Sequence, residues 1–242
     1  GGYGLQRIID KVVLPQRPKD QWPMLVGFSD ITALHSLLSL HGVASLHANM
    51  CKDLSLLPDE DIALSAEREF FMADTIPSPL SFTSHLLPLT YHPSPHHANV
   101  PYTIHHTSSS PLNRGGEVVG KLIGGNLSVL YGLQGTPYSL NKIIEQCEQP
   151  PILFIEDISE NHYHIDRMLN SLRMSAVFDS IGGLVVGQFT DCADDPSMGC
   201  SLLESIRQVV DDYSFPILFD YPSGHIDSNY PLLLSADYLL SV

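Results

Sequence analysis

Residues 22–35 read Trp-Pro-Met-Leu-Val-Gly-Phe-Ser-Asp-Ile-Thr-Ala-Leu-His, and this stretch predicts a strand, a tight turn and a helix. The apolar run at 24–26 has the length and composition of a short buried strand. Gly27 permits a sharp turn after it, because glycine has no side chain to clash. The apolar residues then follow at helical spacing, at Ile31, Leu34, Leu37 and Leu38.

Ser29 falls at the apex of the predicted turn. Its hydroxyl would be lifted clear of the backbone, and the amides that open the next helix would point toward a negative charge forming beside it. This is the geometry of a nucleophile elbow. The common elbow pattern is Gly-x-Ser-x-Gly, and this chain has Ile31 at the last position. The alternative interpretation is that Ser29 or Asp30 simply caps the helix.

Composition and charge favour a globular protein and argue against a membrane-spanning or nucleic-acid-binding one. The chain has 242 residues, enough for one large or two small domains, and 43% of them are hydrophobic and 16% charged. No apolar run approaches the length that spans a bilayer. The net charge of −15 argues against a nucleic-acid partner, since phosphate binding needs clustered Lys and Arg. Four scattered cysteines without a C-x-x-C pair indicate reduced thiols in a cytosolic protein.

The segment 76–114 is rich in Pro, Ser, Thr and His, and it lacks apolar periodicity. We interpret it as a linker between an N-terminal domain at 1–75 and a C-terminal domain at 115–242. It contains six histidines, so the two interpretations are a metal site and a solvated loop. No Cys or carboxylate lies at a ligand spacing around them, which favours the loop.

Strands and helices alternate after residue 117, which indicates an α/β architecture. We expect a turn at Gly124-Gly125-Asn126-Leu127. The expected strands lie at 118–123, 152–155, 181–189, 217–219 and 232–234, the last being the final strand. The expected helices lie at 127–133, 163–174 and 202–210.

Ser29, Glu156 and His225 each follow an expected strand. Groups just past the carboxyl ends of strands line the functional crevice of α/β folds. The residue types suit nucleophilic catalysis, since a serine needs a histidine base and the histidine needs a carboxylate that fixes its tautomer. Other interpretations exist: Glu156 as an ion-pair partner of Arg167, and His225 as an ordinary loop residue.

Several motifs along the chain together resemble the LD-carboxypeptidases, a serine peptidase family that includes the microcin C immunity peptidases. They occur in the family's order. They are Gly1-Gly2-Tyr3-Gly4 with Arg7, the elbow Gly27-Phe28-Ser29-Asp30-Ile31-Thr32-Ala33-Leu34-His35, Gly124-Gly125-Asn126-Leu127 with Gly135-Thr136-Pro137, Leu153-Phe154-Ile155-Glu156-Asp157 with Glu160, Tyr163, Ile165, Asp166 and Arg167, Gly183-Leu184-Val185-Val186-Gly187, and Gly224-His225 with Asn229 and Pro231.

The resemblance implies Ser29 as nucleophile, Glu156 as acid and His225 as base. It implies an oxyanion hole made of the backbone amides of Asp30 and Gly2. The implied fold is α/β, with a flavodoxin-like N-terminal domain that here would lack its first strands. A C-terminal α/β domain with a small barrel-like sheet would follow it.

The sequence departs from the family pattern in three places. Family members usually carry further strand–helix units before the Gly-Gly-Tyr-Gly turn, so we expect the 242 residues to be part of a longer gene product. The family usually reads His-Gly-Pro where this chain has His47-Ala48-Asn49. The segment 76–114 is longer and richer in histidine than expected.

The resemblance implies a cytoplasmic serine carboxypeptidase that releases a C-terminal D-amino acid from the murein tetrapeptide. It would use no metal or cofactor and bind a small peptide rather than nucleic acid or membrane. Because members of the family are often dimeric, the resemblance also implies a homodimer. One alternative is a microcin C immunity-type peptidase that cleaves aminoacyl or peptidyl nucleotide amides. A second is a non-catalytic binding relative that keeps the pocket.

Overall fold

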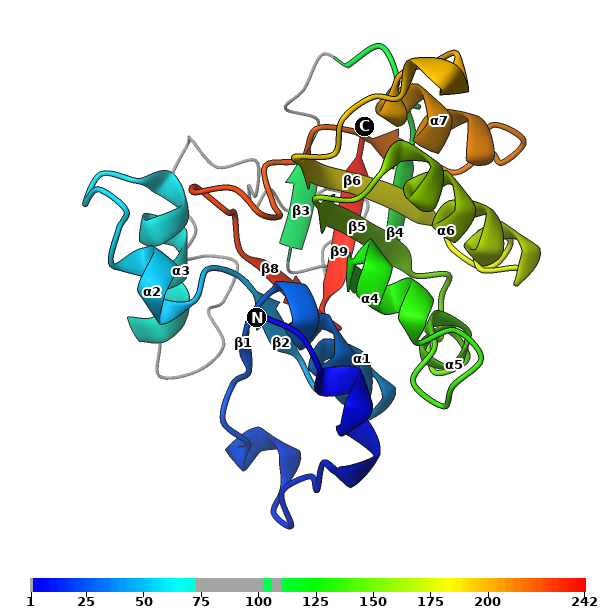
Figure 1. Cartoon of the computed structure of the whole chain (residues 1–242). Coiled ribbons are helices and arrows are strands. Elements are labelled where there is room, and N and C mark those ends of the chain that lie inside the picture. Colours follow the sequence, from blue (N-terminus) through cyan, green and yellow to red (C-terminus); the bar gives the residue numbers. More distant parts are fainter. Residues whose placement is uncertain (1, 73–101, 106–109) are drawn as a thin grey trace.

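The computed structural model describes residues 2–72, 102–105 and 110–242, and it has a mixed α/β architecture built on two sheets (Figure 1). The α/β class expected from the sequence is therefore confirmed. Most of the segment 76–114, including five of its six histidines, lies outside the described residues. Its part at Tyr102–His105 forms strand β3.

The smaller sheet joins the two ends of the chain. It has the order β1-β2-β8, from β1 (Val26–Gly27), β2 (Ser45–His47) and β8 (Leu232–Leu234). β1 and β2 are parallel, and β8 is antiparallel to β2. A strand of the predicted C-terminal domain thus lies beside strands of the predicted N-terminal one. The domain boundaries at 75 and 115 stay a prediction.

The larger sheet has the order β3-β9-β4-β5-β6-β7. Strands β4 (Glu117–Asn126), β5 (Ile152–Ile158), β6 (Gly183–Thr190) and β7 (Ile217–Leu218) are mutually parallel. β9 (Asp237–Ser241) runs antiparallel to β4 and parallel to β3. The helices of this part are α4 (Leu127–Gly132), α5 (Leu140–Ile144), α6 (His162–Met174) and α7 (Leu202–Val209).

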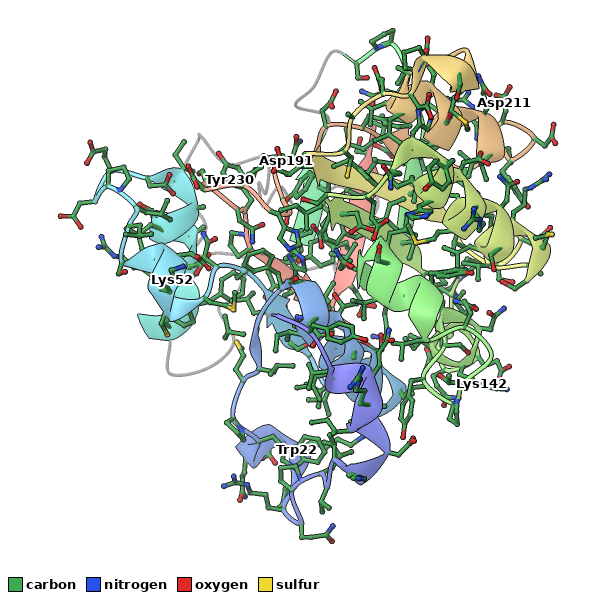
Figure 2. All side chains as sticks on the ribbon, in the orientation of Figure 1. Trp22, Lys52, Lys142, Asp191, Asp211 and Tyr230 are labelled. Carbon is green, nitrogen blue, oxygen red and sulfur yellow. The ribbon has the colours of Figure 1, made fainter. Side chains whose placement is uncertain are left out.

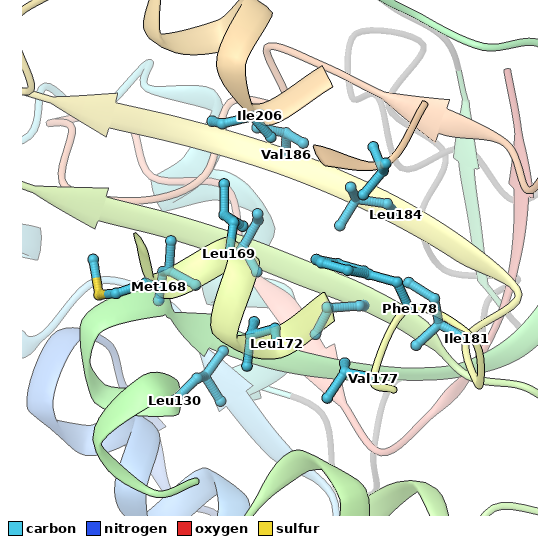
Figure 3. Packing of buried hydrophobic residues seen from close by; sticks show 14 of the residues in the cluster. Leu130, Met168, Leu169, Leu172, Val177, Phe178, Ile181, Leu184, Val186 and Ile206 are labelled. Carbon is cyan, nitrogen blue, oxygen red and sulfur yellow. The ribbon is translucent and has the colours of Figure 1, made fainter. Parts of the chain in front are cut away.

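The larger sheet is buried on both faces. Along β5, Leu153 and Ile155 pack into one apolar cluster, and Ile152 and Phe154 pack into another. Successive strand residues point to opposite faces, so the uninterrupted apolar run at 152–155 is what a sheet covered on both sides requires. Figure 3 shows one of these faces, where α6 and α7 lie over β5 and β6 and bury side chains such as Leu169 and Phe178.

The remaining helices precede the larger sheet. α1 (Thr32–Leu40) follows the predicted elbow, and α2 (Cys51–Leu54) and α3 (Ile62–Met72) lie to one side of the molecule (Figure 1). Short 3-10 turns occupy Leu5–Arg7, Ile9–Lys11, Lys19–Gln21, Ser29–Ile31 and Pro196–Met198. Among the described residues, no helix combines the length and the apolar character that a membrane crossing requires.

Three expectations about strands were wrong. β4 runs on through Gly124, Gly125 and Asn126, where a turn was expected, and β5 runs on through Glu156. A further strand, β9, follows the one that was expected to be last.

Glycine in a sequence often indicates a turn, but Gly124 lies inside a strand, where it allows β4 and β5 to pack closely. A Cβ at this position would lie 1.9 Å from the carbonyl oxygen of Phe154.

We therefore expect Gly124→Ala to be one of the most destabilising single-methyl changes in the chain. The added carbon meets rigid backbone at a residue with a φ of 130°, so β4 and β5 must move apart, at a cost of about 3 kcal/mol or more. Gly115→Ala is the matched control, since its Cβ would meet only an ordinary contact at 3.5 Å. Urea unfolding of the two variants checks this, and equal midpoints would contradict it.

Candidate active site

The elbow is observed at Ser29, between β1 and α1. Ser29 has a φ of 67°, in the left-handed region that a non-glycine residue occupies at a cost. The preceding Phe28 is extended, with a φ of −147°. Residues 29–31 make a 3-10 turn that leads directly into α1. A strand, a tight turn and a helix are thus present, with Ser29 at the sharpest point, but the strand is Val26–Gly27 rather than 24–26, so Gly27 ends the strand instead of lying in the turn.

Ile31 explains why this elbow lacks its second glycine. The Ile31 side chain packs against the backbone of Gly27, where a Cβ would lie 3.3 Å from Ile31 Cγ1. Residues 27 and 31 can therefore pack closely because position 27 has no side chain, and position 31 does not need to be glycine. The buried His35 of α1 strengthens the same turn, because its Nε2 lies 2.9 Å from the Gly27 carbonyl and its Nδ1 lies 2.7 Å from the hydroxyl of Ser45 in β2.

The glycine-rich turn at the start of the chain is held against the elbow by Asp30. The buried Asp30 carboxylate accepts the backbone N–H of Leu5 at 3.0 Å. Gly2 and Gly4 both have positive φ, at 100° and 116°. Gly2 is exposed, and a Cβ there would meet no atom within 4 Å. The sequence suggested a backbone role for Asp30, and the structure adds this role for its side chain.

Glu156 and His225 are brought together by hydrogen bonding. His225 Nδ1 lies 2.7 Å from Glu156 Oε2, although the two residues are 69 positions apart in the chain. Glu156 is fully buried in β5, and His225 lies in the loop between β7 and β8. Burial by itself raises the pKa of Glu156, but the hydrogen bond with His225 and the charge interactions with His225 and His47 outweigh it and leave the pKa below its ordinary value. The acid is therefore an ionised carboxylate at neutral pH.

Phe28 connects the elbow to this pair. Its ring meets the ring of His225 edge to face, with the centroids 4.8 Å apart. Since Phe28 directly precedes Ser29, the contact brings the elbow to the histidine that Glu156 orients. Glu156 of β5 and His225 of the loop after β7 are thus in contact, and Phe28, the residue before Ser29, contacts His225 from the turn after β1.

The loop that carries His225 requires glycine at Gly224. A Cβ there would lie 3.2 Å from Glu156 Oε2 and 3.1 Å from the carbonyl oxygen of Gln188, at a φ of 139°. The side chain of Asn229 holds the loop from inside, since its Oδ1 accepts the N–H of Gly224 at 2.9 Å. This accounts physically for the motif of Gly224, His225 and Asn229.

Asp157 is adjacent to Glu156 but serves a different purpose. Its carboxylate accepts hydrogen bonds from Asn126 Nδ2 and from both the amide and the hydroxyl of Ser128. Burial raises the pKa of Asp157 to about 6. Through its hydrogen bonds with Ser128, Asp157 holds the start of α4 against β5. Among the described residues, the hydrogen bonds of Asp157 do not involve His225, so Glu156 is the carboxylate that contacts this histidine.

A cavity of about 280 Å³ opens beside the elbow. Its lining comes from the glycine-rich turn, the elbow and the start of α4, and includes Tyr3, Gly4, Arg7, Asp30, Ser128 and Glu160. The Arg7 guanidinium lies over the Tyr3 ring, 5.4 Å from its centroid. Arg7 has no carboxylate partner among the ion pairs of the described residues. Sequence reasoning did not assign Ser128 or His47 to the site, although Ser128 follows the motif at 124–127 and His47 keeps the histidine of the family's His-Gly-Pro.

The part of the chain that the structure describes holds no cluster of three or more His, Cys, Asp or Glu side chains that could bind a metal. The four cysteines are unpaired. Labelled charged side chains such as Lys52, Lys142 and Asp211 lie on the outer surface, away from the site (Figure 2).

Comparison with known proteins gives the same family twice. A family model described as the LD-carboxypeptidase C-terminal domain matches residues 119–240, and one described as the LD-carboxypeptidase N-terminal domain matches residues 1–48.

Among similar proteins, a Bacillus subtilis protein named "Probable murein peptide carboxypeptidase" is 30% identical over 98% of this chain. The murein tetrapeptide carboxypeptidase of Pseudomonas aeruginosa is 29% identical over 93% of this chain. This chain spans 65% of the length of each of these relatives.

The fold agrees with that of a solved structure. The crystal structure of muramoyltetrapeptide carboxypeptidase from Oxalobacter formigenes superposes with a TM-score of 0.71 at 23% identity, over 100% of this chain and 73% of that one. Together with the family models and the arrangement of the elbow, the acid and the histidine, this leads to one conclusion: the chain belongs to the LD-carboxypeptidase family.

Proposed function

We propose that this protein is a serine carboxypeptidase that hydrolyses an L,D-amide bond and releases the C-terminal D-amino acid of the murein tetrapeptide in the cytoplasm. The observation that carries the proposal is the 2.7 Å bond between Glu156 and His225, formed beside the elbow at Ser29. The reaction class comes from the family, and the substrate is that named for the Pseudomonas aeruginosa relative.

In the proposed reaction Ser29 is the nucleophile and His225 is the general base. Glu156 accepts the Nδ1 proton of His225, which leaves Nε2 as the nitrogen that takes the serine proton. Ser29 then attacks the carbonyl carbon of the scissile amide. The proton on His225 passes to the leaving amine as the C–N bond breaks, and water hydrolyses the acyl-enzyme by the reverse sequence of proton transfers.

The developing oxyanion needs donors that are already in place. We assign these to the backbone amides of Asp30 and Gly2. The amide of Asp30 belongs to the 3-10 turn that opens α1, and amides at such a turn suit a developing negative charge. The bond from Leu5 N to Asp30 Oδ2, which ties the residue after the glycine-rich turn to the elbow, supports the assignment of Gly2.

A carboxypeptidase must also recognise a free terminal carboxylate. The cavity beside the elbow offers one arginine for this purpose, Arg7, from the glycine-rich turn that also carries Gly2. A guanidinium pairs with a carboxylate through two parallel hydrogen bonds. We therefore propose that the released D-alanine lies in this cavity, with its carboxylate on Arg7.

A substrate panel tests the function and the role of Arg7 together. We expect D-alanine release from the murein tetrapeptide, much slower cleavage of the same peptide with an amidated C-terminus, and slower cleavage still of an aminoacyl sulfamoyl adenylate. For Arg7→Ala, we expect kcat/KM for the free peptide to fall by about 30-fold or more, since one charge-assisted contact is lost. Cleavage of the amidated peptide should change little.

Each arm of the panel has a result that contradicts the proposal. Preference for the nucleotide amide would assign a microcin C immunity-type activity. Absence of any turnover, together with no labelling of Ser29 by an activated phosphonate in folded protein, would assign a binding role. An equal loss on free and amidated peptides in Arg7→Ala would remove Arg7 from carboxylate recognition.

A further inference from the structure

The carboxylate of Glu156 is satisfied on one side only. Its Oε2 receives His225, but its Oε1 has no hydrogen-bond partner among the described residues, although the side chain is fully buried. A buried carboxylate oxygen without a donor is costly, and a charged group more so than a neutral one. The site as described so far therefore lacks a donor on the far side of its acid.

His47 supplies the missing half of the contact. It is also fully buried, and its Nε2 is likewise without a hydrogen-bond partner. The two unpaired atoms face each other, with Nε2 of His47 4.0 Å from Oε1 of Glu156. A donor and an acceptor, each buried and each unpaired, thus lie about one ångström beyond hydrogen-bond distance.

The fold holds His47 in this position. It is the last residue of β2, and its Cα partners are Gly27 of the elbow strand and Leu232 of β8. Its ring meets that of Phe154 edge to face, with centroids 5.0 Å apart. On the other side of the ring, the Ser223 hydroxyl lies 3.4 Å from Nδ1. The ring is therefore fixed by packing, with Nε2 turned to the acid.

We propose that His47 is a positioning residue for the reaction, which acts through Glu156 by donating its Nε2 proton to Oε1. The inference rests on the proposed function. In it, Glu156 must stay charged and correctly rotated while His225 gains a proton from Ser29. A donor on Oε1 prevents the carboxylate from rotating away from His225. The catalytic unit is then a chain of four side chains, Ser29, His225, Glu156 and His47.

The groups around the pair are fixed by the fold. Ser223 donates its hydroxyl proton to Oδ1 of Asn229 at 3.0 Å, and the same oxygen also accepts the amide of Gly224, so the Ser223 oxygen is held 3.4 Å from Nδ1 of His47. The ionisable groups that bear on the pair are His225 and Asp157 beside Glu156, and His35, whose ring centroid lies 6.3 Å from that of His47. Burial lowers the pKa of His35 to about 3, so His35 is neutral.

The first test needs neither a variant nor a substrate. The ring nitrogen shifts of ¹⁵N-labelled histidines report which nitrogen of His47 carries the proton. We expect Nε2 to carry a proton that exchanges slowly with water. A neutral ring protonated at Nδ1, with Nε2 bare, would overturn the inference whether or not the protein is a peptidase.

The second test compares His47→Phe with His47→Gln, which restores a donor. Without a donor on Oε1 the negative charge of Glu156 bears more strongly on His225, so we expect the His225 pKa followed by NMR to rise by about one unit in His47→Phe. In His47→Gln it should stay near its original value. If tetrapeptide is turned over, kcat should fall about tenfold in His47→Phe with KM unchanged.

His162→Phe is the matched control, since His162 is another buried histidine, bonded to Ser205 away from the site. It should leave the His225 titration unchanged. An unchanged titration in His47→Phe as well would overturn the inference. A raised pKa without any tetrapeptide turnover would instead reject the proposed function and retain the role of His47.

Discussion

Replacing Ser29 by Ala is expected to lower kcat on the tetrapeptide by about 10⁴-fold or more, because the attacking oxygen is removed and only binding and oxyanion stabilisation remain. Substrate affinity should change little. Ser29 is half-buried, and its hydroxyl makes no hydrogen bond with the residues that the structure describes, so it contributes little to stability. Initial rates and substrate titration of the purified variant measure the two quantities separately.

Ser36→Ala is the matched control for this variant. Ser36 lies on α1, two turns after the elbow, and its hydroxyl is buried without a hydrogen-bond partner. Its removal should leave both stability and rate near the original values, because no bond is broken. If Ser29→Ala kept a rate close to that of Ser36→Ala, a serine acyl-enzyme would be the wrong mechanism.

The local geometry of the elbow could be predicted because its determinants are adjacent in the chain. The apolar run at 24–26, Gly27 and the helical spacing of residues 31–38 decide the strand, the turn and the helix without help from elsewhere. The contact that makes Ile31 acceptable, its packing on Gly27, also lies within this stretch. The same holds for the buried strand at 152–155 and for α6, whose apolar face repeats at helical spacing.

The features that depend on contacts between residues far apart in the chain could not be predicted. Gly124 and Gly125 carry the usual signal of a turn, and only the neighbouring β5 backbone shows why glycine is needed inside a strand. β9 is short and ends in a polar residue, and its role follows from pairing with β4 and β3. His47 sits in a segment with no catalytic pattern, and its position opposite Glu156 arises from the pairing of β2 with β1.

Replacing Glu156 by Gln tests the acid without changing the shape of the side chain. The amide can present an N–H to Nδ1 of His225, which would favour the tautomer with its proton on Nε2. That tautomer cannot accept the Ser29 proton, so we expect kcat to fall by about 10³ to 10⁴-fold. KM should change little, because Glu156 is buried behind His225 and lies outside the cavity lining.

The neighbouring Asp157→Asn provides the control, because it alters an equally buried carboxylate in the same strand. Asp157 accepts bonds from Ser128 and Asn126, so its loss should lower the free energy of unfolding by about 1–2 kcal/mol while kcat changes only a few-fold. Comparable losses of kcat in the two variants would indicate a general disturbance of β5 rather than a specific role of Glu156.

The difference in stability between the original protein and Glu156→Gln should also depend on pH, in a defined direction. The pKa of Glu156 lies below its ordinary value of 4.5 in the folded chain, so its ionised form stabilises the fold at pH values above 4.5 and this contribution is lost as the pH falls through the folded pKa. The original protein should therefore be more stable than Glu156→Gln at neutral pH, and the difference should shrink in acid. Urea midpoints measured between neutral and acidic pH check this. A difference that grew as the pH fell would mean that the buried carboxylate destabilises the fold, so that His225 and His47 do not compensate for its burial.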